Sequence, residues 1–405
     1  MSQLIFINLF IDNNWDDEKV IDQIYSVKLN SSAEILDSYQ NWGVYEGVPG
    51  DSAIVVQKFD PSFREFLADK LDLADEIFES DLSHLKNVTS FHFVGISQTE
   101  QNIISRFPSV KNNYLSEASY KNLNSKITLY EIAKDNEINF PESSIVKLKD
   151  FKELEKSSSS YVLKYINSAG GRGVFIINES TKNLVSFIDR QLEEKSKDLQ
   201  FLKQEYVEIK SHFYTLANTN YSSSEVSGFK IIYDKHKNSK LHIYEDAISE
   251  DRIKAAEKIA SSLRALGYSG VFGFDGFEST NGDIYPAVDL NVRYDKSRMI
   301  LNLAKKFNIH HNYFEFRRER FHSKSYKTFE QYWSSRIDDL NEINKKYDNR
   351  FYLLPVLFSN FFKAEEQSDM VEISFFTGHN SSNQTGFQAW ITEIYNWMGI
   401  PASLT

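Results

Sequence analysis

The chain contains no cysteine among its 405 residues. Disulfide bridges, thiolate nucleophiles and cysteine-ligated zinc sites are therefore excluded together. The absence fits a reducing compartment, and we expect a cytoplasmic protein. Positive charge is also scarce, because 46 Lys and Arg stand against 57 Asp and Glu, which gives a net charge of −11. DNA and phospholipid surfaces are bound by clustered Lys and Arg, so we expect neither nucleic acid nor a membrane as a partner.

Long apolar runs are missing as well. The run at residues 4–10 follows no positively charged segment and precedes no small-residue cleavage site, which favours a buried strand over a signal peptide. The run at 351–362 is too short to cross a bilayer and contains Pro355. The sequence therefore predicts no membrane segment.

The remaining composition is that of an ordinary globular chain, with 41% hydrophobic and 25% charged residues. Its length suggests two or three domains. The first unit is expected to contain a small, mostly parallel sheet, because strand patterns at 4–10, 52–56 and 90–95 alternate with a helical pattern at 62–71. This unit has no phosphate-binding fingerprint, so it would either hold a substrate or support the units that follow.

The stretch 267–297 carries the clearest chemical pattern in the chain. Its first apolar run, 271–277, is interrupted by Asp275 and bounded by glycines, as in a buried strand with one carboxylate. Residues 279–282 have the composition of a turn, and the alternation of residues 285–292 is typical of a second strand. The stretch therefore predicts an antiparallel hairpin.

Four polar residues of this hairpin suggest a metal site. Strand side chains repeat with period two, so Asp289, Asn291 and Arg293 share one face. Asp275 and Asp289 would be neighbours across the turn, and Mg²⁺ is usually held by one or two carboxylates together with phosphate oxygens. The pattern fits phosphoryl transfer, although an ordinary hairpin with polar groups on its solvent face is the alternative.

A glycine-rich loop joins two further expected strands within residues 160–178. Glycines leave backbone N–H groups open to the close approach of an anion; Arg172 adds charge to the loop, and Lys164 lies on the preceding strand. A hairpin that uses glycine for turn geometry alone is the alternative reading. The glycines are Gly170, Gly171 and Gly173.

Helical patterns connect these parts. A helix is expected from Asn124 or Ser125 to about Asn136, followed by a strand, and the clearest helix in the chain covers 251–266 and ends at Gly267. The other expected elements are helices near Asp150 and at 182–195, 301–307, 329–346 and 388–398, and strands at 199–209, 226–233, 241–244, 352–358 and 371–376.

Three polar clusters of the last quarter carry little functional signal. His310 and His311 have no partner at metal-ligand spacing, so they are expected to be surface or packing residues. The basic cluster at 317–320 is expected to form a solvated face. The polar stretch 377–380 is expected to be a turn.

Taken in order, these pieces resemble the ATP-grasp superfamily of carboxylate–amine ligases. The resemblance covers about residues 120–300, and it lies in the series SKITLYEIAKDNEINFP, YVLK, SAGGRGV, KQEYVE, GFDGF and AVDLNVR. The order of units resembles the branch of amide ligases in peptide antibiotic and aminoglycoside side-chain biosynthesis. The implied class is α/β (α+β) with an ATP-grasp fold. The implied units are an N-terminal α/β domain (1–115), a small subdomain with the glycine loop (116–198), a large subdomain with the metal site (199–310) and a C-terminal α/β extension (311–405).

The resemblance implies a nucleotide site for ATP. Lys126 and Lys164 match the two lysines that contact nucleotide phosphate, and the glycine loop matches the lid over the triphosphate. At the hinge that holds adenine, Glu205 would accept the adenine amino group and Val207 would offer its backbone. Glu208 and His212 both stay open for the ribose contact. The implied set is Lys126, Lys164, Gly170, Gly171, Arg172, Gly173, Gln204, Glu205, Tyr206, Val207, Glu208 and His212.

The resemblance also implies metal ligands and catalytic residues. Asp275, Asp289 and Asn291 would bind the metal, expected to be two Mg²⁺ ions, with Mn²⁺ as the alternative. Asp289 stands where the family has glutamate and is one methylene shorter, which leaves bridging of two ions open. Arg293, Arg172 and Lys164 are the implied catalytic residues, with Arg293 gripping the substrate carboxylate or the acyl phosphate.

The implied activity is an ADP-forming ligation of two small molecules. A carboxylate attacks the γ-phosphate of ATP, and an amine then attacks the acyl phosphate and expels phosphate, so that no nucleophilic side chain is required. The expected partners are a small carboxylate and a small amine, and a homodimer is expected from the family. The alternatives are the same activation with an ester, thioester or carrier-linked acceptor, a nucleotide-binding protein without turnover, and an unrelated structural protein.

Overall fold

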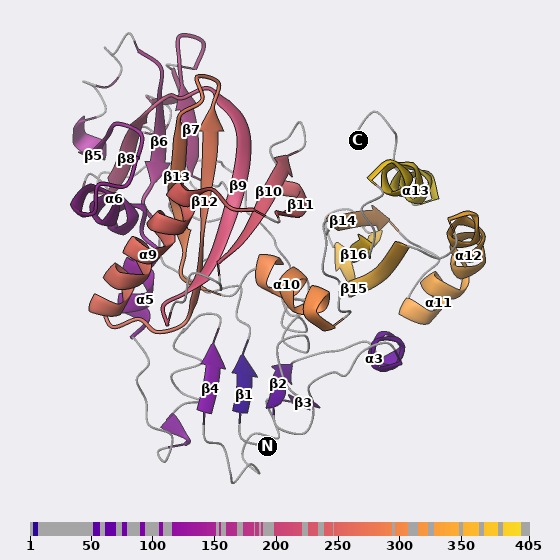
Figure 1. Cartoon of the computed structure of the whole chain (residues 1–405). Helices are drawn as coiled ribbons and strands as arrows, with labels where there is room; N and C mark the ends of the chain where they lie inside the picture. The colour runs from indigo at the N-terminus through magenta and orange to yellow at the C-terminus, as the bar shows by residue number, and fades with distance from the viewer. Residues whose placement is uncertain are drawn as a thin grey trace.

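Figure 1 shows the computed structural model of the chain. It describes residues 3–6, 52–56, 61–69, 75–78, 90–93, 105–107, 116–150, 154, 159–167, 173–181, 183–185, 188, 198–220, 226–233, 239–245, 247–293, 296–306, 315–322, 328–347, 351–363, 368–379 and 384–397. Several sequence predictions lie outside these described residues: Gly170, Gly171, Arg172, most of the helix expected at 182–195, His310, His311 and Asn380.

The first unit contains a small parallel sheet, as the sequence predicted. Its order is β3-β2-β1-β4, and the three recorded strand pairings are parallel. Helix α3 (Pro61–Ala68) buries Phe63 and Leu67. The strands are β1 (Gln3–Phe6), β2 (Ser52–Val56), β3 (Asp75–Phe78), which the sequence reading had not identified, and β4 (Ser90–Phe93).

A second, antiparallel sheet has the order β5-β8-β6-β7. Near Asp150, where a second helix was expected, the described residues form one 3-10 turn, η3 (Leu148–Asp150). Strand β8 pairs with β5 and β6, so this sheet continues past residue 198, where the small subdomain was expected to end. The strands are β5 (Ser143–Lys147), β6 (Tyr161–Tyr165), β7 (Val174–Ile177) and β8 (Gln200–Glu205).

The third sheet is five-stranded and antiparallel, in the order β11-β10-β9-β12-β13. The strand expected at 199–209 is confirmed over residues 200–205, but its end is wrong, because the chain leaves β8 and enters β9 after residues 206–208. Residues 213–217 of β9 are all buried, so their sequence lacks the alternation that marks a half-exposed strand. The strands are β9 (Ile209–Asn218), β10 (Ser227–Tyr233), β11 (Ser239–Glu245), β12 (Val271–Ser279) and β13 (Ile284–Asn291).

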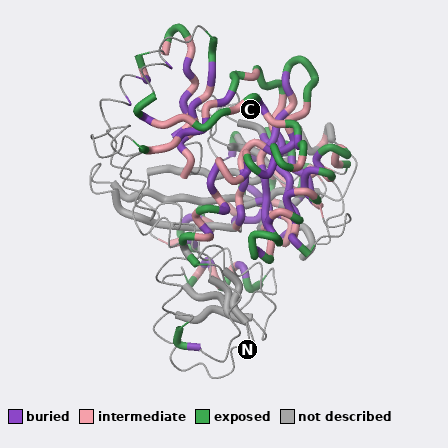
Figure 2. Tube along the Cα trace, turned by 90° about the vertical axis from the view of Figure 1, so that its left-hand side faces the viewer, coloured by how far each residue is buried: buried purple, intermediate pink, exposed green. Residues whose placement is uncertain are grey.

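Three helices, α5 (Glu117–Leu123), α6 (Lys126–Asp135) and α9 (Glu250–Ala265), belong to the core of the third sheet. Their buried side chains form one cluster with Phe272 and Phe274 of β12, and Figure 2 shows the buried stretches concentrated here. Helix α9 presents small alanines to the sheet, which allows close approach. Leu266, the last residue of the expected helix, follows the end of α9 as its C-cap and is 52% exposed.

The C-terminal part contains an antiparallel sheet in the order β14-β16-β15. The helix expected at 329–346 is two helices that separate at residues 335–336, and residues 377–379 of the expected turn belong to β16. The elements are α10 (Lys296–Lys306), β14 (Glu315–His322), α11 (Phe329–Ser334), α12 (Ile337–Lys346), β15 (Phe351–Lys363), β16 (Ser368–His379) and α13 (Gln384–Trp397).

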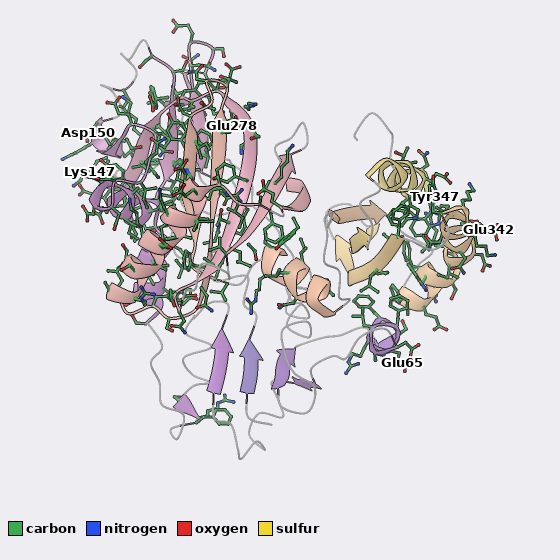
Figure 3. All side chains as sticks on the ribbon, viewed as in Figure 1. Glu65, Lys147, Asp150, Glu278, Glu342 and Tyr347 are labelled. Atoms are coloured by element: carbon green, nitrogen blue, oxygen red, sulfur yellow. The ribbon has the colours of Figure 1, made fainter. Side chains whose placement is uncertain are left out.

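Aromatic rings join the first and last units. The Phe329 ring of α11 lies 4.8 Å from that of Phe63 and 5.0 Å from that of Phe66, both on α3. Figure 3 labels Glu65 on α3, and Glu342 and Tyr347 at α12, in this part of the molecule. In the part of the chain that the structure describes, no helix is long and apolar enough to cross a membrane.

Candidate functional site

The polar residues of the hairpin β12–β13 face each other across two adjacent strands. Asp275 pairs directly with Asp289, and Gly273 with Asn291. Residues that oppose each other in an antiparallel pair project their side chains to the same side of the sheet. The predicted hairpin is therefore confirmed, and the two carboxylates lie on one face.

Backbone packing fixes the position of Asp275. The register of the two strands shifts opposite Gly276, because β12 advances two residues from Asp275 to Phe277 while β13 advances four from Asp289 to Tyr285. A Cβ at Gly276 would lie 2.4 Å from the carbonyl oxygen of Pro286 and 2.7 Å from that of Tyr285. Glycine is therefore required for β13 to approach this point so closely.

Lys126 reaches this face from helix α6. The helix begins at Lys126, and the Ser125 hydroxyl caps it by accepting from the backbone N–H of Ile127. The Lys126 Nζ donates to Asp289 Oδ1 at 3.2 Å, and the lysine side chain is only 3% exposed. The N-terminal end of α6 is also held, because the Lys126 N–H donates to the Ile166 carbonyl.

Lys164 comes to the same place from β6 of the neighbouring sheet. Its Nζ donates to the carbonyl of Val288, the residue before Asp289, at 3.3 Å. Burial lowers the pKa of Lys164 to about 8; the carboxylate of Asp289 opposes this shift, and the charge of Lys126 adds to it. A helix and a neighbouring sheet therefore each bring one lysine to the vicinity of Asp289.

Asn291 and Arg293 continue this network along β13. The Asn291 Nδ2 donates to Asp275 Oδ2 at 3.2 Å, and its Oδ1 accepts from Arg293 Nη2 at 2.9 Å. The end of β13 is fixed from outside, since the Val292 N–H donates to Asn124 Oδ1 at 2.8 Å. The sequence indicates Asn124 only as a possible start of a helix, and a contact across 168 residues leaves no local sequence signal.

The expected hinge covers the end of β8, with Gln204 and Glu205, and residues 206–208, which lead to β9. Gln204 is buried, and its Nε2 donates to Ser143 Oγ, so its side chain is bound within the sheet. Glu205 Oε1 accepts from the Glu142 N–H at 3.0 Å, whereas Tyr206 is 46% exposed. The side chains of Gln204 and Glu205, both in the expected hinge, are therefore already hydrogen-bonded to residues 142–143.

Of the two ribose candidates, Glu208 lies just before strand β9 and His212 lies within it. The Glu208 carbonyl accepts from the Thr280 N–H at 2.9 Å, which ties it to the β12–β13 turn. His212 pairs with Ile231 of β10 and Phe277 of β12 in the third sheet. In the glycine loop, Gly173 has a φ of 69°, and its carbonyl accepts from the Tyr165 N–H.

The donor set suits a hard divalent cation. Asp275, Asp289 and Asn291 supply oxygen atoms, and Mg²⁺ commonly takes one or two carboxylates and completes its shell with water and phosphate. No group of three or more His, Cys, Asp or Glu suited to a metal ion occurs in the described ranges. The residues therefore fit Mg²⁺ bound together with a phosphate ligand better than a metal held by protein alone.

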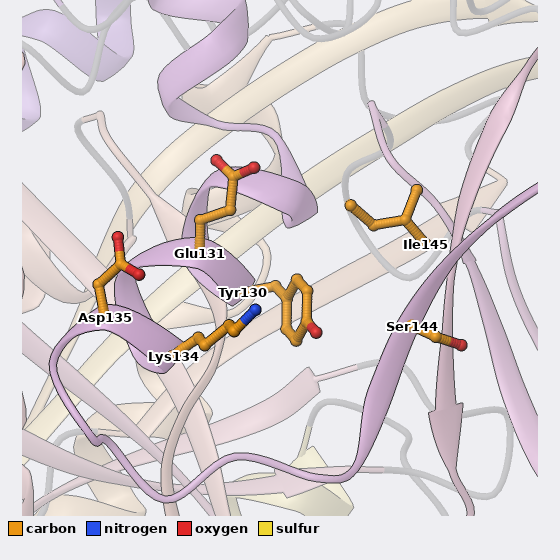
Figure 4. Close-up of a pocket in the computed structure, with 6 residues that line it drawn as sticks. All are labelled: Tyr130, Glu131, Lys134, Asp135, Ser144 and Ile145. Atoms are coloured by element: carbon orange, nitrogen blue, oxygen red, sulfur yellow. The ribbon is translucent and has the colours of Figure 1, made fainter.

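A surface hollow of about 530 Å³ lies between α6 and β5, apart from these residues. Figure 4 shows its lining, to which Tyr130, Lys134 and Ile145 contribute. The Tyr130 hydroxyl donates to the Ser143 carbonyl at 3.1 Å. None of the residues around Asp289 lines this hollow.

The chain was compared with family models, curated proteins and solved structures. No protein-family model matches the chain. The chain is similar to the [butirosin acyl-carrier protein]–L-glutamate ligase of Niallia circulans, with 31% identity over 115 residues. This match spans 28% of the chain and about a quarter (24%) of that ligase.

Solved structures match over nearly the whole chain. An N5-carboxyaminoimidazole ribonucleotide synthetase in complex with ADP has a TM-score of 0.54 at 11% identity, covering 98% of this chain and 97% of its own. The N5-carboxyaminoimidazole synthetase of Staphylococcus aureus with ADP gives 0.51 at 12%, covering 98% and 96%. Phosphoribosylamine–glycine ligase of Thermotoga maritima gives 0.52 at 11%, covering 98% and 96%. The chain therefore has the fold of these synthetases and ligases, which is the ATP-grasp fold that the sequence resemblance implied.

Proposed function

We propose that the chain is an ATP-dependent, ADP-forming ligase that activates a carboxylate as an acyl phosphate and joins it to an amine. One observation carries the proposal: Asp275 and Asp289 face each other, Lys126 of helix α6 bonds Asp289, and Lys164 of strand β6 bonds the backbone carbonyl next to it. Phosphoryl transfer depends mainly on positioning and charge neutralisation, which this group of charges can supply. The similar structures with bound ADP support the same assignment.

In this proposal Asp275, Asp289 and Asn291 hold Mg²⁺, which neutralises phosphate charge when bound. Lys126 and Lys164 bind the phosphates of ATP, and the loop with Arg172 covers them. A substrate carboxylate oxygen attacks the γ-phosphorus as the bond to ADP breaks. The amine nitrogen then attacks the acyl carbon and loses a proton, and phosphate leaves with the former carboxylate oxygen.

Arg293 is the proposed contact for the reacting carboxylate. Its guanidinium is anchored to Asn291, beside the two carboxylates that would hold the metal. A planar guanidinium can bond both oxygens of a carboxylate, so this position suits a group that orients the acyl donor. The proposed adenine contacts are those of residues 204–208, and Glu208 and His212 both remain candidates for the ribose.

A carrier-linked substrate is the second candidate. The relative of Niallia circulans is named for an acyl-carrier protein, which it joins to L-glutamate. That match covers a quarter of the relative, and acceptor sites are built largely from loops that vary between enzymes of one fold. A free amine and a carrier-linked group therefore need to be compared directly.

The test is release of ADP and phosphate from Mg·ATP by the full chain. Pools of amino acids, small carboxylic acids and amine-loaded carrier proteins are each added, and every mixture is analysed by mass spectrometry. We expect release that depends on one donor and one acceptor, with a product lighter than their sum by one water. Asp289→Asn is the matched control and should lose release. If ATP binds but no pool stimulates release, the ligase assignment is wrong.

A further inference from the structure

The oxygens proposed to bind the metal are already engaged by donors of the chain itself. Asp289 Oδ1 accepts from Lys126 Nζ, Asp275 Oδ2 from Asn291 Nδ2, and Asn291 Oδ1 from Arg293 Nη2. In this arrangement the Asn291 amide turns its nitrogen, not its oxygen, toward Asp275. A divalent ion that takes these three oxygens binds only after the donors rearrange.

The Lys126–Asp289 pair is the strongest of these obstacles. The Lys126 side chain is 3% exposed, and its ammonium lies 3.2 Å from an oxygen that the metal would need. A metal ion on the same oxygen would bring two positive centres close together away from bulk water, where repulsion is weakly screened. Lys164 adds a further positive charge near the same carboxylate.

We propose that Lys126 is an internal counter-ion that closes the metal site until nucleotide phosphate draws it from Asp289. Divalent metal then binds together with the nucleotide and not before it. This inference rests on the proposed function, because it assigns the metal to Asp289 and phosphate to Lys126. It adds an order of binding and a second role for one lysine.

In this proposal the change is confined to the Lys126 side chain. The Lys126 N–H is bound to the Ile166 carbonyl and the helix is capped by Ser125, so the start of α6 is anchored. The lysine ammonium sits on a flexible four-carbon stem, so it can move from a carboxylate to a phosphate bound nearby. A nucleotide phosphate carries more negative charge than Asp289 and binds the metal as well. It would therefore attract Lys126 away from Asp289 and at the same time deliver the metal to Asp289.

The experiment measures Mn²⁺ binding to the full chain by the loss of the free-ion EPR signal, with and without a non-hydrolysable ATP analogue. Lys126→Met removes the charge and keeps most of the length. Lys210→Met is the control, because Lys210 makes a comparable pair with Glu278 of β12 at 2.7 Å, on the exposed surface. The double variant Lys126→Met/Asp289→Asn asks whether any new Mn²⁺ site uses Asp289.

The wild type and Lys210→Met should bind Mn²⁺ weakly alone and much more tightly with the analogue. Lys126→Met should bind Mn²⁺ alone about tenfold more tightly or better, as expected when a competing charge is removed, and the double variant should lose this gain. If Lys126→Met binds Mn²⁺ alone no better than the wild type, or if the gain survives Asp289→Asn, Lys126 does not close the site. Analogue-dependent Mn²⁺ binding by the wild type would still support the proposed function in either case, whereas its absence would count against that function.

Discussion

Lys164 shows how single residues set the properties of this site. Its side chain extends from β6 of the second sheet, and its Nζ donates to the Val288 carbonyl of the third sheet, next to Asp289. Burial lowers its pKa to about 8 even though a carboxylate stands close by. Its charge is therefore sensitive to pH in a range where an ordinary lysine stays fully protonated.

Nucleotide affinity should consequently depend on pH. Because the pKa is lowered, Lys164 carries its proton below about pH 8 and loses it above that value. A neutral amine does not attract phosphate, so affinity for an ATP analogue should be highest below pH 8 and then fall, by at most about tenfold per pH unit.

Titration of the analogue at fixed Mg²⁺, at pH values on both sides of 8, checks this expectation. Lys164→Arg is the control, since a guanidinium keeps its proton throughout and should give a flat profile. A wild-type affinity that stays constant from neutral pH to well above 8 would show that Lys164 does not contact the phosphates.

Arg293 should matter for the acyl donor and little for ATP. Arg293→Ala removes the proposed grip on the carboxylate and leaves both lysines in place, so ligation should fall by about a hundredfold or more. The dissociation constant of the ATP analogue should change by less than about threefold, because the proposed phosphate contacts Lys126 and Lys164 are unchanged. Equal loss of ligation and nucleotide binding would contradict this role.

The hairpin β12–β13 is the element that places the metal ligands. Its register sets Asp275 opposite Asp289, and the register shift at Gly276 lets the Pro286 and Tyr285 carbonyls come close. The strand could not keep this path with a side chain at that point, because two of the three nearest atoms are backbone carbonyl oxygens.

Gly276→Ala should therefore disturb the site from within the sheet. The added methyl group would force β12 and β13 apart and lower the free energy of unfolding by about 1–3 kcal/mol. Mn²⁺ binding in the presence of nucleotide should weaken as well. Urea unfolding and Mn²⁺ titration measure both effects. Asn281→Ala, in the exposed turn of the same hairpin, should change neither, and equal effects of the two substitutions would contradict this explanation.

Sequence patterns were most informative where structure is local. The hairpin, the helix capped by Ser125 and the strand pair around the glycine loop all follow from turn glycines, capping residues and alternation within short stretches. Strand β9 was missed because its middle is buried on both faces and no polar residue alternates there.

Contacts between distant segments could not be read from these patterns. Lys126 and Asp289 are 163 residues apart, and Lys164 meets Val288 across 124 residues. Only the family resemblance indicated that these lysines would serve one site. The closing hydrogen bonds of Asn291 and Arg293 follow from the packing of β13 and have no sequence signature.

At the scale of the whole molecule, the first and last units meet through α3 and α11. Phe329 is 1% exposed and contacts the rings of Phe63, Phe66 and Trp333. One hydrogen bond also joins the two units here: the Glu330 N–H donates to the Ser62 side-chain oxygen Oγ at 3.1 Å.

Phe329→Ala should loosen this junction. Removal of a buried ring costs about 3–5 kcal/mol of stability, and the loss should fall on the contact between the first and last units. Limited proteolysis should therefore release fragments from both ends faster than in the wild type. Glu330→Ala, an exposed neighbour on α11, should behave as the wild type, and no difference between the two variants would show that the junction contributes little.

The central claim is that a substrate carboxylate is phosphorylated and then joined to an amine. The most direct measurement uses the donor and acceptor found by the release assay, with ¹⁸O in both carboxylate oxygens of the donor. The proposed mechanism predicts that each phosphate released carries one ¹⁸O, because the attacking oxygen leaves with phosphorus, and that the product retains the other. Phosphate without ¹⁸O, formed together with the same product, would contradict activation through an acyl phosphate.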